Sequence, residues 1–287
     1  MKILLLGKNG QLGWELSRCL QPLGQVTALD YPEINLAAPD SIRALVGQIA
    51  PDIIVNATAY TAVDQAEDQR DLADSINGMA PGVLAEEARN LGAALIHYST
   101  DYVFNGTKGQ PYCESDDPDP LNAYGKSKLR GEQAVQGVGG AYLILRTAWV
   151  YSLRGESFVR KVLQWARQSE TLRIVEDQVS NPTWARMLAA ATALLLARGT
   201  GTIREHTGLY HLAGGGYASR LDWAREILKL DPKSAEQTVK QLLPALTSDF
   251  PTPANRPLFS ALDCSLFRDT FGIFLPPWET ALKLAMA

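Results

Sequence analysis

The residues whose types and spacing could do chemistry are a threonine, a tyrosine and a lysine near the middle of the chain. Thr100 closely follows the apolar run 94–98, which is typical of a buried strand, and therefore lies at that strand's carboxyl end. Tyr124 and Lys128 are four residues apart in a segment with helical spacing from about 123 to 136, so both side chains share one helix face. An ammonium near a phenol favours the phenolate, so the pair could deliver a proton near neutral pH, while Thr100 would hold a substrate oxygen. Such a pair also occurs by chance on surface helices, and the surrounding motifs must decide.

A glycine loop near the amino terminus is the first of these motifs. The apolar segment 2–6 predicts a strand, Gly7, Gly10 and Gly13 follow it, and a helical pattern begins directly afterwards. Glycines let the backbone approach a pyrophosphate, whose charge is met by amides at the start of the helix. The loop therefore favours a dinucleotide, although a tight turn that needs glycine for its geometry alone would look similar.

A carboxylate follows the second predicted strand, 25–29. Asp30 could accept hydrogen bonds from the adenosine ribose, and it favours NAD because it would repel a 2'-phosphate. Lys8 in the glycine loop could offset that repulsion, and a solvated turn carboxylate before Pro32 is an equally good interpretation.

The order of elements predicts an α/β protein with a Rossmann-type doubly wound parallel sheet and a smaller carboxyl-terminal substrate lobe. Helices at about 39–49 and 81–91 alternate with strands at 53–56, 94–98 and 142–146, whereas the acidic segment 64–68 is interpreted as a solvated helix start. We expect a dinucleotide-binding domain over 1–150, with a return contribution from about 177–200, and a mainly substrate-binding lobe over 151–287. Arg256 in the proline-rich segment 244–257 is a candidate for a pyrophosphate, with a structural salt bridge as the equal alternative.

Composition excludes several classes of protein. The chain has 46% apolar and 20% charged residues and a net charge of -4, which excludes a disordered chain and offers no broad basic surface for nucleic acid. Its three cysteines are far apart and lack metal-ligand spacing, so no metal site is expected. The longest apolar run, 187–197, is about half of the roughly 20 residues that a membrane helix needs. We therefore expect no membrane partner and a cytoplasmic location.

Several longer motifs resemble one family. They are the glycine loop, 99–106 (STDYVFNG), 124–132 (YGKSKLRGE), 146–151 (RTAWVY), 177–183 (DQVSNPT), 208–212 (GLYHL) and 251–257 (PTPANRP). Together they resemble the dTDP-4-dehydrorhamnose reductases, which are extended short-chain dehydrogenases/reductases, and the resemblance covers essentially the whole chain. It implies reduction of the C4 ketone of dTDP-4-dehydro-L-rhamnose to dTDP-L-rhamnose with NADPH or NADH. This is the final step of dTDP-rhamnose biosynthesis, for cell-surface polysaccharide.

The resemblance also implies a role for each matching residue. Tyr124 would be the proton donor, supported by Lys128 and Thr100. The implied cofactor-binding residues, beside Tyr124 and Lys128, are Gly7, Gly10, Gln11, Leu12, Asp30, Asn35, Leu36, Ala59, Tyr60, Thr61 and Tyr98. The implied substrate-binding residues, beside Arg256, are Thr100, Asp101, Tyr102, Val63 and Trp149.

Two departures from the family pattern affect these expectations. Glu15 and Glu279 match two positions of a magnesium site at the family's dimer interface, but Arg186 occupies the third, where a cation would repel the metal. Magnesium dependence is therefore doubtful, and a monomer or weak homodimer is expected. Asn35 replaces an aspartate that is usual in the family. Two alternative functions remain: a non-catalytic NADP-binding regulatory subunit, and a reductase or epimerase of another nucleotide sugar.

Overall fold

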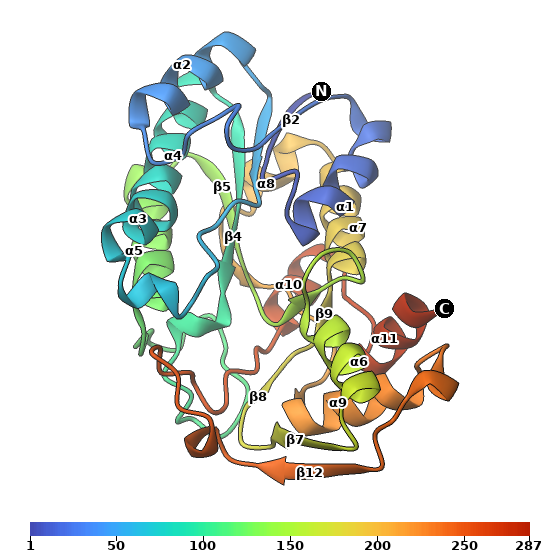
Figure 1. Cartoon of the computed structure of the whole chain (residues 1–287). Helices are drawn as coiled ribbons and strands as arrows, with labels where there is room; N and C mark the ends of the chain where they lie inside the picture. The colour runs from blue at the N-terminus through green and yellow to red at the C-terminus, as the bar shows by residue number, and fades with distance from the viewer.

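The computed structural model describes residues 1–287 and is built around one sheet of six strands (Figure 1). The strands are β1 (Lys2–Leu6), β2 (Gln25–Leu29), β3 (Ile53–Asn56), β4 (Ala94–Thr100), β5 (Ala141–Thr147) and β10 (Gly208–His211). Their order is β10-β5-β4-β3-β1-β2, and every neighbouring pair is parallel. The chain thus winds outward from β1 in one direction to β2 and in the other through β3 to β5. This arrangement confirms the predicted doubly wound, Rossmann-type α/β fold.

Helices cover both faces of the sheet. The helices on one face include α2 (Pro39–Ile49), α4 (Ala80–Leu91) and α5 (Ala123–Val138), and those on the other include α1 (Gln11–Cys19), α7 (Ala185–Leu196), α8 (Thr200–Glu205) and α10 (Ser265–Phe271). Alternation along β1 shows why both layers are needed: Ile3 and Leu5 pack towards α1 and α7, whereas Leu4 and Leu6 pack towards α2 and α4. A strand that is apolar on both faces is stable only when both faces are covered.

A second, smaller group of elements lies beside the sheet, at the lower right of Figure 1. It contains β6 (Val150–Tyr151), α6 (Phe158–Gln168), β7 (Thr171–Val175), β8 (Val179–Ser180), β9 (Thr183–Trp184), β11 (Ala218–Ser219), α9 (Arg220–Lys229), β12 (Gln241–Ala245) and α11 (Trp278–Met286). These elements share their own apolar core, which includes Tyr151, Trp223 and Trp278. We call this group the lobe.

The return of the chain from the lobe to the sheet is longer than the expected segment 177–200. Helix α7 packs along α1, and β10 then adds the edge strand next to β5. The sheet therefore includes residues to His211. Short connecting helices are η1 (Gln21–Leu23), η2 (Gln65–Glu67), α3 (Arg70–Asp74), the π-helical η3 (Ser75–Met79), η4 (Asp101–Val103), η5 (Ser234–Glu236) and η6 (Thr247–Asp249). No helix combines the length and the apolar character that crossing a membrane requires.

Candidate active site

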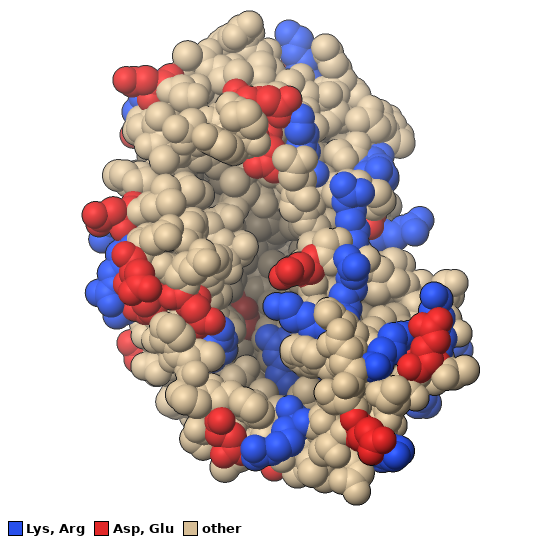
Figure 2. Space-filling model, in the orientation of Figure 1, with Lys and Arg blue, Asp and Glu red and all other residues tan.

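A cleft of about 600 Å³ lies where the carboxyl ends of β1, β3, β4 and β5 meet the lobe. Figure 2 shows a hollow down the middle of this face, with a largely uncharged floor and several Lys and Arg side chains along its margin. The lining residues are Gly7, Gly10, Gln11, Leu12, Asp30, Ala57, Thr58, Ala59, Thr61, Val63, Tyr98, Ser99, Thr100, Asp101, Tyr102, Tyr124, Lys128, Thr147, Ala148, Trp149, Val150 and Arg220. Most of the site residues expected from the sequence are therefore brought together.

Four expected residues do not line this cleft. Leu36 is buried in the core beneath α2 and α4, and the Asn35 side chain accepts a hydrogen bond from the Ala37 N–H. The Tyr60 hydroxyl donates to the Gln69 side chain. Arg256 forms an ion pair with Asp64 at 2.8 Å.

The glycine loop is shaped by close backbone packing. Gly7 has φ of +91°, a conformation that favours glycine, and its N–H donates to the Leu29 carbonyl. A Cβ on Gly13 would lie 1.8 Å from the Gly7 carbonyl oxygen, so α1 approaches the loop as closely as it does only because Gly13 has no side chain. The Gln11 side-chain oxygen accepts a hydrogen bond from the Ser152 N–H at 2.6 Å. The loop is thus fixed both to β2 and to the first residues of the lobe.

Asp30 and Lys8 lie at the far end of the cleft, where an adenosine ribose is expected. The Asp30 carboxylate accepts hydrogen bonds from the backbone N–H groups of Asn9 and Tyr31, which fixes its orientation. The Lys8 ammonium is paired with Glu33 at 2.5 Å. Lys8 is therefore already engaged by a carboxylate and is less available to offset the charge of Asp30.

Cavity walls contain polar groups that lack partners within the protein. The hydroxyls of Thr58, Ser99 and Thr147 are buried, line the cleft and make no hydrogen bond. Because buried hydroxyls are normally hydrogen-bonded, these three show that the cavity wall holds polar groups that the protein alone does not satisfy. A glycine-lined entrance, a fixed carboxylate and unpartnered hydroxyls together fit a dinucleotide.

Helix α5 carries Tyr124 and Lys128, and its first turn is held from two sides. The Asn122 side chain caps the helix by accepting from the Gly125 N–H, while its amide donates to the Asn255 carbonyl. Glu67 accepts a hydrogen bond from the Ala123 N–H at 2.8 Å. These contacts fix the start of the helix, and hence the position of Tyr124, relative to the cleft.

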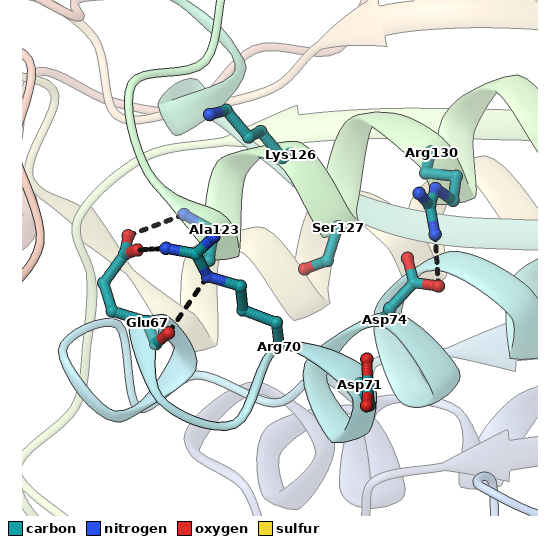
Figure 3. Close-up of a pocket in the computed structure, with 8 residues that line it drawn as sticks. All are labelled: Glu67, Arg70, Asp71, Asp74, Ala123, Lys126, Ser127 and Arg130. Carbon is teal, nitrogen blue, oxygen red and sulfur yellow. Dashed lines mark hydrogen bonds and ion pairs between the residues drawn. The ribbon is translucent and has the colours of Figure 1, made fainter.

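The contact of Glu67 belongs to a second hollow, of about 250 Å³, between η2, α3 and α5 (Figure 3). Its charges are largely paired among themselves, because Glu67 binds Arg70 and Asp74 binds Arg130. The segment 64–68, expected to be a solvated helix start, therefore connects distant parts of the chain. Glu67 accepts a hydrogen bond from the first residue of α5, and Asp64 accepts one from Arg256. Its sequence neighbours gave no sign of either partner, since both lie far along the chain.

Tyr124 and Thr100 form one interacting pair in the cleft. Burial raises the pKa of Tyr124 above its ordinary value, and a hydrogen bond with Thr100 lowers it in part. The Tyr102 ring packs edge-to-face against the Tyr124 ring with centroids 5.9 Å apart. The expectation that Lys128 would favour the phenolate is therefore wrong for this structure, because burial shifts the pKa of Tyr124 upward and the Lys128 ammonium is bound to the Tyr98 carbonyl. The phenol carries its proton at neutral pH.

Lys128 is almost completely buried, with 1% of its surface exposed. Its ammonium donates to the Tyr98 carbonyl at 2.7 Å and lies 3.2 Å from Nε2 of His97. Burial lowers the pKa of Lys128 to about 8, with Glu132 acting in the opposite direction. His97 is itself buried, and its other ring nitrogen, Nδ1, contacts the Asn56 side chain at 3.1 Å.

Asp101 marks the lobe end of the cleft. It is 2% exposed, and its carboxylate accepts hydrogen bonds from Ser180, Ser260 and Thr100. Burial raises its pKa to about 6, and these three hydroxyls act in the opposite direction. Trp149 lies on the same side and stacks on Trp223 with ring centroids 5.5 Å apart. Arg220, which the sequence did not single out, completes this wall of the cleft.

The three positions compared with a magnesium site contain no carboxylate cluster. No group of three His, Cys, Asp or Glu side chains in the chain is arranged to hold a metal ion. The Arg186 charge acts on the Glu15 carboxyl: burial raises the pKa of Glu15, and Arg186 opposes that rise. The Arg186 cation thus acts on one of the two carboxylates that match the family's magnesium site.

Comparisons with known proteins agree with this geometry. The family model described as the RmlD substrate binding domain matches residues 1–287. A dTDP-4-dehydrorhamnose reductase of Burkholderia thailandensis is 44% identical over 295 residues, covering 100% of this chain and 98% of the relative. A solved dTDP-4-dehydrorhamnose reductase of Clostridium acetobutylicum is 35% identical and superposes with a TM-score of 0.92, covering 100% and 98% of the two chains.

A third comparison concerns the cofactor. The solved dTDP-4-dehydrorhamnose reductase of Bacillus anthracis, in complex with NADP, is 32% identical with a TM-score of 0.90 and covers 99% of this chain and 98% of its own. The fold, the cleft and the full-length matches lead to one assignment. This chain belongs to the dTDP-4-dehydrorhamnose reductase family.

Proposed function

We propose that this protein reduces the C4 ketone of dTDP-4-dehydro-L-rhamnose to dTDP-L-rhamnose, with NADPH or NADH as the reductant. The observation that carries the proposal is the convergence of Tyr124, Thr100 and Lys128 in one cleft with the glycine loop. The relatives of matching length carry the name of this reaction, which supports the same substrate.

The cofactor would lie between the glycine loop and the middle of the cleft. Gly10, Gln11 and Leu12 would hold its pyrophosphate and Asp30 its adenosine ribose, while Ala59 and Thr61 would contact the nicotinamide half. Bound there, it supplies the hydride that ketone reduction requires.

The protein's own residues would supply the proton. Tyr124 donates its phenolic proton to the ketone oxygen as that oxygen gains charge, and Thr100 holds the same oxygen in place. Lys128, whose ammonium lies in the same cleft wall and donates to the Tyr98 carbonyl, would stabilise the Tyr124 phenolate that remains after transfer until a proton from solvent regenerates the phenol. It would also hold the nicotinamide ribose. Asp101, Tyr102, Val63 and Trp149 enclose the sugar.

Other features of the proposal concern the whole molecule. We assign cofactor binding to residues 1–150 with the returning segment that includes α7, and sugar-nucleotide binding mainly to residues 151–287. A cytoplasmic location suits a pathway whose substrate is a nucleotide sugar, and we place the protein as a monomer or weak homodimer without a nucleic-acid partner. Arg186 beside Glu15 supports activity without magnesium.

The test is oxidation of NADPH and of NADH, followed by loss of absorbance, with dTDP-4-dehydro-L-rhamnose as substrate and with or without magnesium. Tyr124→Phe should lower kcat by about 10²–10⁴ and change cofactor affinity far less, because the ring is retained and only the hydroxyl that donates the proton is removed. Tyr217→Phe, which alters an exposed tyrosine of the lobe, is the matched control and should retain activity.

Two outcomes would contradict the proposal. Turnover that survives in Tyr124→Phe would exclude that residue as the acid. Cofactor binding without turnover on this substrate would favour the non-catalytic regulatory subunit, or a reductase or epimerase of another nucleotide sugar.

A further inference from the structure

Arg220 is a cation held in an aromatic box at the lobe end of the cleft. It is the first residue of α9, directly after the cap Ser219, and its guanidinium lies 3.6 Å from the centre of the Trp149 ring. Phe158 and Trp223 lie on the same guanidinium at 4.8 and 5.6 Å. Stacking on aromatic faces fixes the plane of a guanidinium but leaves its N–H groups free to donate.

No carboxylate neutralises this charge. The ion pairs of the chain do not include Arg220. Its polar neighbours are the Tyr102 phenol and, at longer range, the Arg256 guanidinium and Asp101, whose oxygens already accept three hydroxyl hydrogen bonds. Burial lowers the pKa of Arg220 to about 10, so the side chain is still a cation at neutral pH. A partly buried cation without a carboxylate partner favours a ligand that supplies an anion.

The other arginine near this region is in the opposite situation. Arg256 is paired with Asp64, donates to Thr252 and does not line the cleft. Its charge is therefore compensated within the protein, whereas that of Arg220 is not. Arg256 lies close enough to act on Tyr102 and Arg220, but of the two arginines Arg220 is the one that lines the cleft.

The position of Arg220 relative to the proton donor fits the shape of a sugar nucleotide. Tyr102 packs against the Tyr124 ring and also lies next to the Arg220 guanidinium, so one aromatic ring separates the acid from the cation. In a hexose joined to a nucleotide through C1, the C4 carbonyl and the first phosphate are at opposite ends of the ring. A ketone at Tyr124 would thus place its phosphates towards Arg220.

We propose that Arg220 is the residue that binds the diphosphate of the sugar nucleotide, through N–H donors presented by the Trp149 box. This inference rests on the proposed function for the class of substrate, and it assigns the diphosphate to Arg220 in place of Arg256. Paired donors of a guanidinium match two phosphate oxygens, which makes the contact directional as well as electrostatic.

The test is calorimetric binding of dTDP, which carries the diphosphate without the sugar. Arg220→Met retains an apolar stem inside the aromatic box and removes the charge, and it should weaken dTDP binding at least about tenfold. Arg256→Met should change it less than threefold. Arg225→Met, which removes an exposed cation of the same helix that is paired with Asp222, should leave it unchanged.

For each variant, the affinity for NADPH and the thermal midpoint of unfolding are also measured. Wild-type values show that the fold is intact, so that a loss of dTDP affinity reports the loss of a contact. Unchanged dTDP affinity in Arg220→Met, with wild-type NADPH binding, would overturn the inference, as would a larger loss in Arg256→Met. In turnover, Arg220→Met should raise KM for the sugar nucleotide more than it lowers kcat, because the diphosphate does not react.

The same titration distinguishes failure of this inference from failure of the proposed function. If the wild-type protein binds dTDP and the Arg220 variant binds it equally well, the inference is wrong and the reductase remains. If wild-type protein binds UDP or GDP but not dTDP, and Arg220→Met weakens that binding, the inference holds and the proposed substrate is wrong. If it binds none of the three, both fall.

Discussion

Lys128 gives a sharp prediction because its charge is buried and the cost of burying it depends on pH. In the folded chain its pKa is about 8, against an ordinary value of 10.5. Between these two values the unfolded chain holds a proton that the folded chain has released, so the unfolded state binds more protons and stability rises with pH. Below pH 8 both states are protonated and the full cost of the buried ammonium remains.

Over the whole difference of about 2.5 pKa units, at about 1.4 kcal/mol for each unit, stability would rise by about 3.5 kcal/mol, and the roughly 1.5 units between pH 8 and pH 9.5 contribute about 2 kcal/mol of it. We expect the free energy of unfolding of the wild-type chain, relative to Lys128→Met, to increase by about 2 kcal/mol between pH 7 and pH 9.5. The absolute difference at either pH also contains the loss of the hydrogen bonds to Tyr98 and His97, so the change with pH is the informative quantity.

Urea unfolding of both proteins at the two pH values measures this change. Lys126→Met is the matched control, since it removes an exposed lysine from the same helix and should alter the difference by less than about 0.5 kcal/mol. If the free energies of unfolding of wild type and Lys128→Met change with pH by the same amount, the buried lysine has the same pKa in the folded and unfolded chains. The assignment of a costly buried ammonium to this site would then be wrong.

Two further predictions concern the cofactor end of the cleft. Gly13→Ala should abolish NADPH binding and lower the melting temperature, because its Cβ would lie 1.8 Å from the Gly7 oxygen. Gly47→Ala is the control: there is open space around this residue in α2, so the change should be neutral or should stabilise the protein by up to about 1 kcal/mol. Glu33→Gln should release Lys8 from its ion pair and raise NADPH affinity relative to NADH by about threefold or more, measured by titration of cofactor fluorescence; an unchanged ratio would show that Lys8 does not meet the 2'-phosphate.

Helices and strands whose ends are marked by nearby residues could be predicted from the sequence. Strands β2 and β3 and helix α2 have the bounds expected, because short apolar runs are delimited by Gly24, Pro51 and the proline that starts the helix at 39. The clustering of Thr100, Tyr124 and the glycine loop followed from a general property of parallel sheets, whose strands end at one edge.

Features that depend on contacts between distant segments were not accessible. Nothing near Arg220 in the sequence indicates that its side chain reaches the cleft, because only the folding of α9 against Trp149 brings it there. Glu67 and Asp64 looked like solvent-facing acids, yet their partners are Ala123 and Arg256, 56 and 192 residues away. Such pairs leave no periodic signal in the sequence.

The late return of the chain to the sheet has a consequence for synthesis on the ribosome. Strand β5 ends at Thr147, but its edge neighbour β10 and the helix that covers α1 arrive only by His211. At a translation rate of about 5–20 residues per second, once β5 is complete the five earlier strands wait roughly 3–13 s for β10, and α1 waits roughly 2–10 s for α7, which ends at Leu196. The nascent chain is therefore most exposed to chaperones and to aggregation while the lobe is being made.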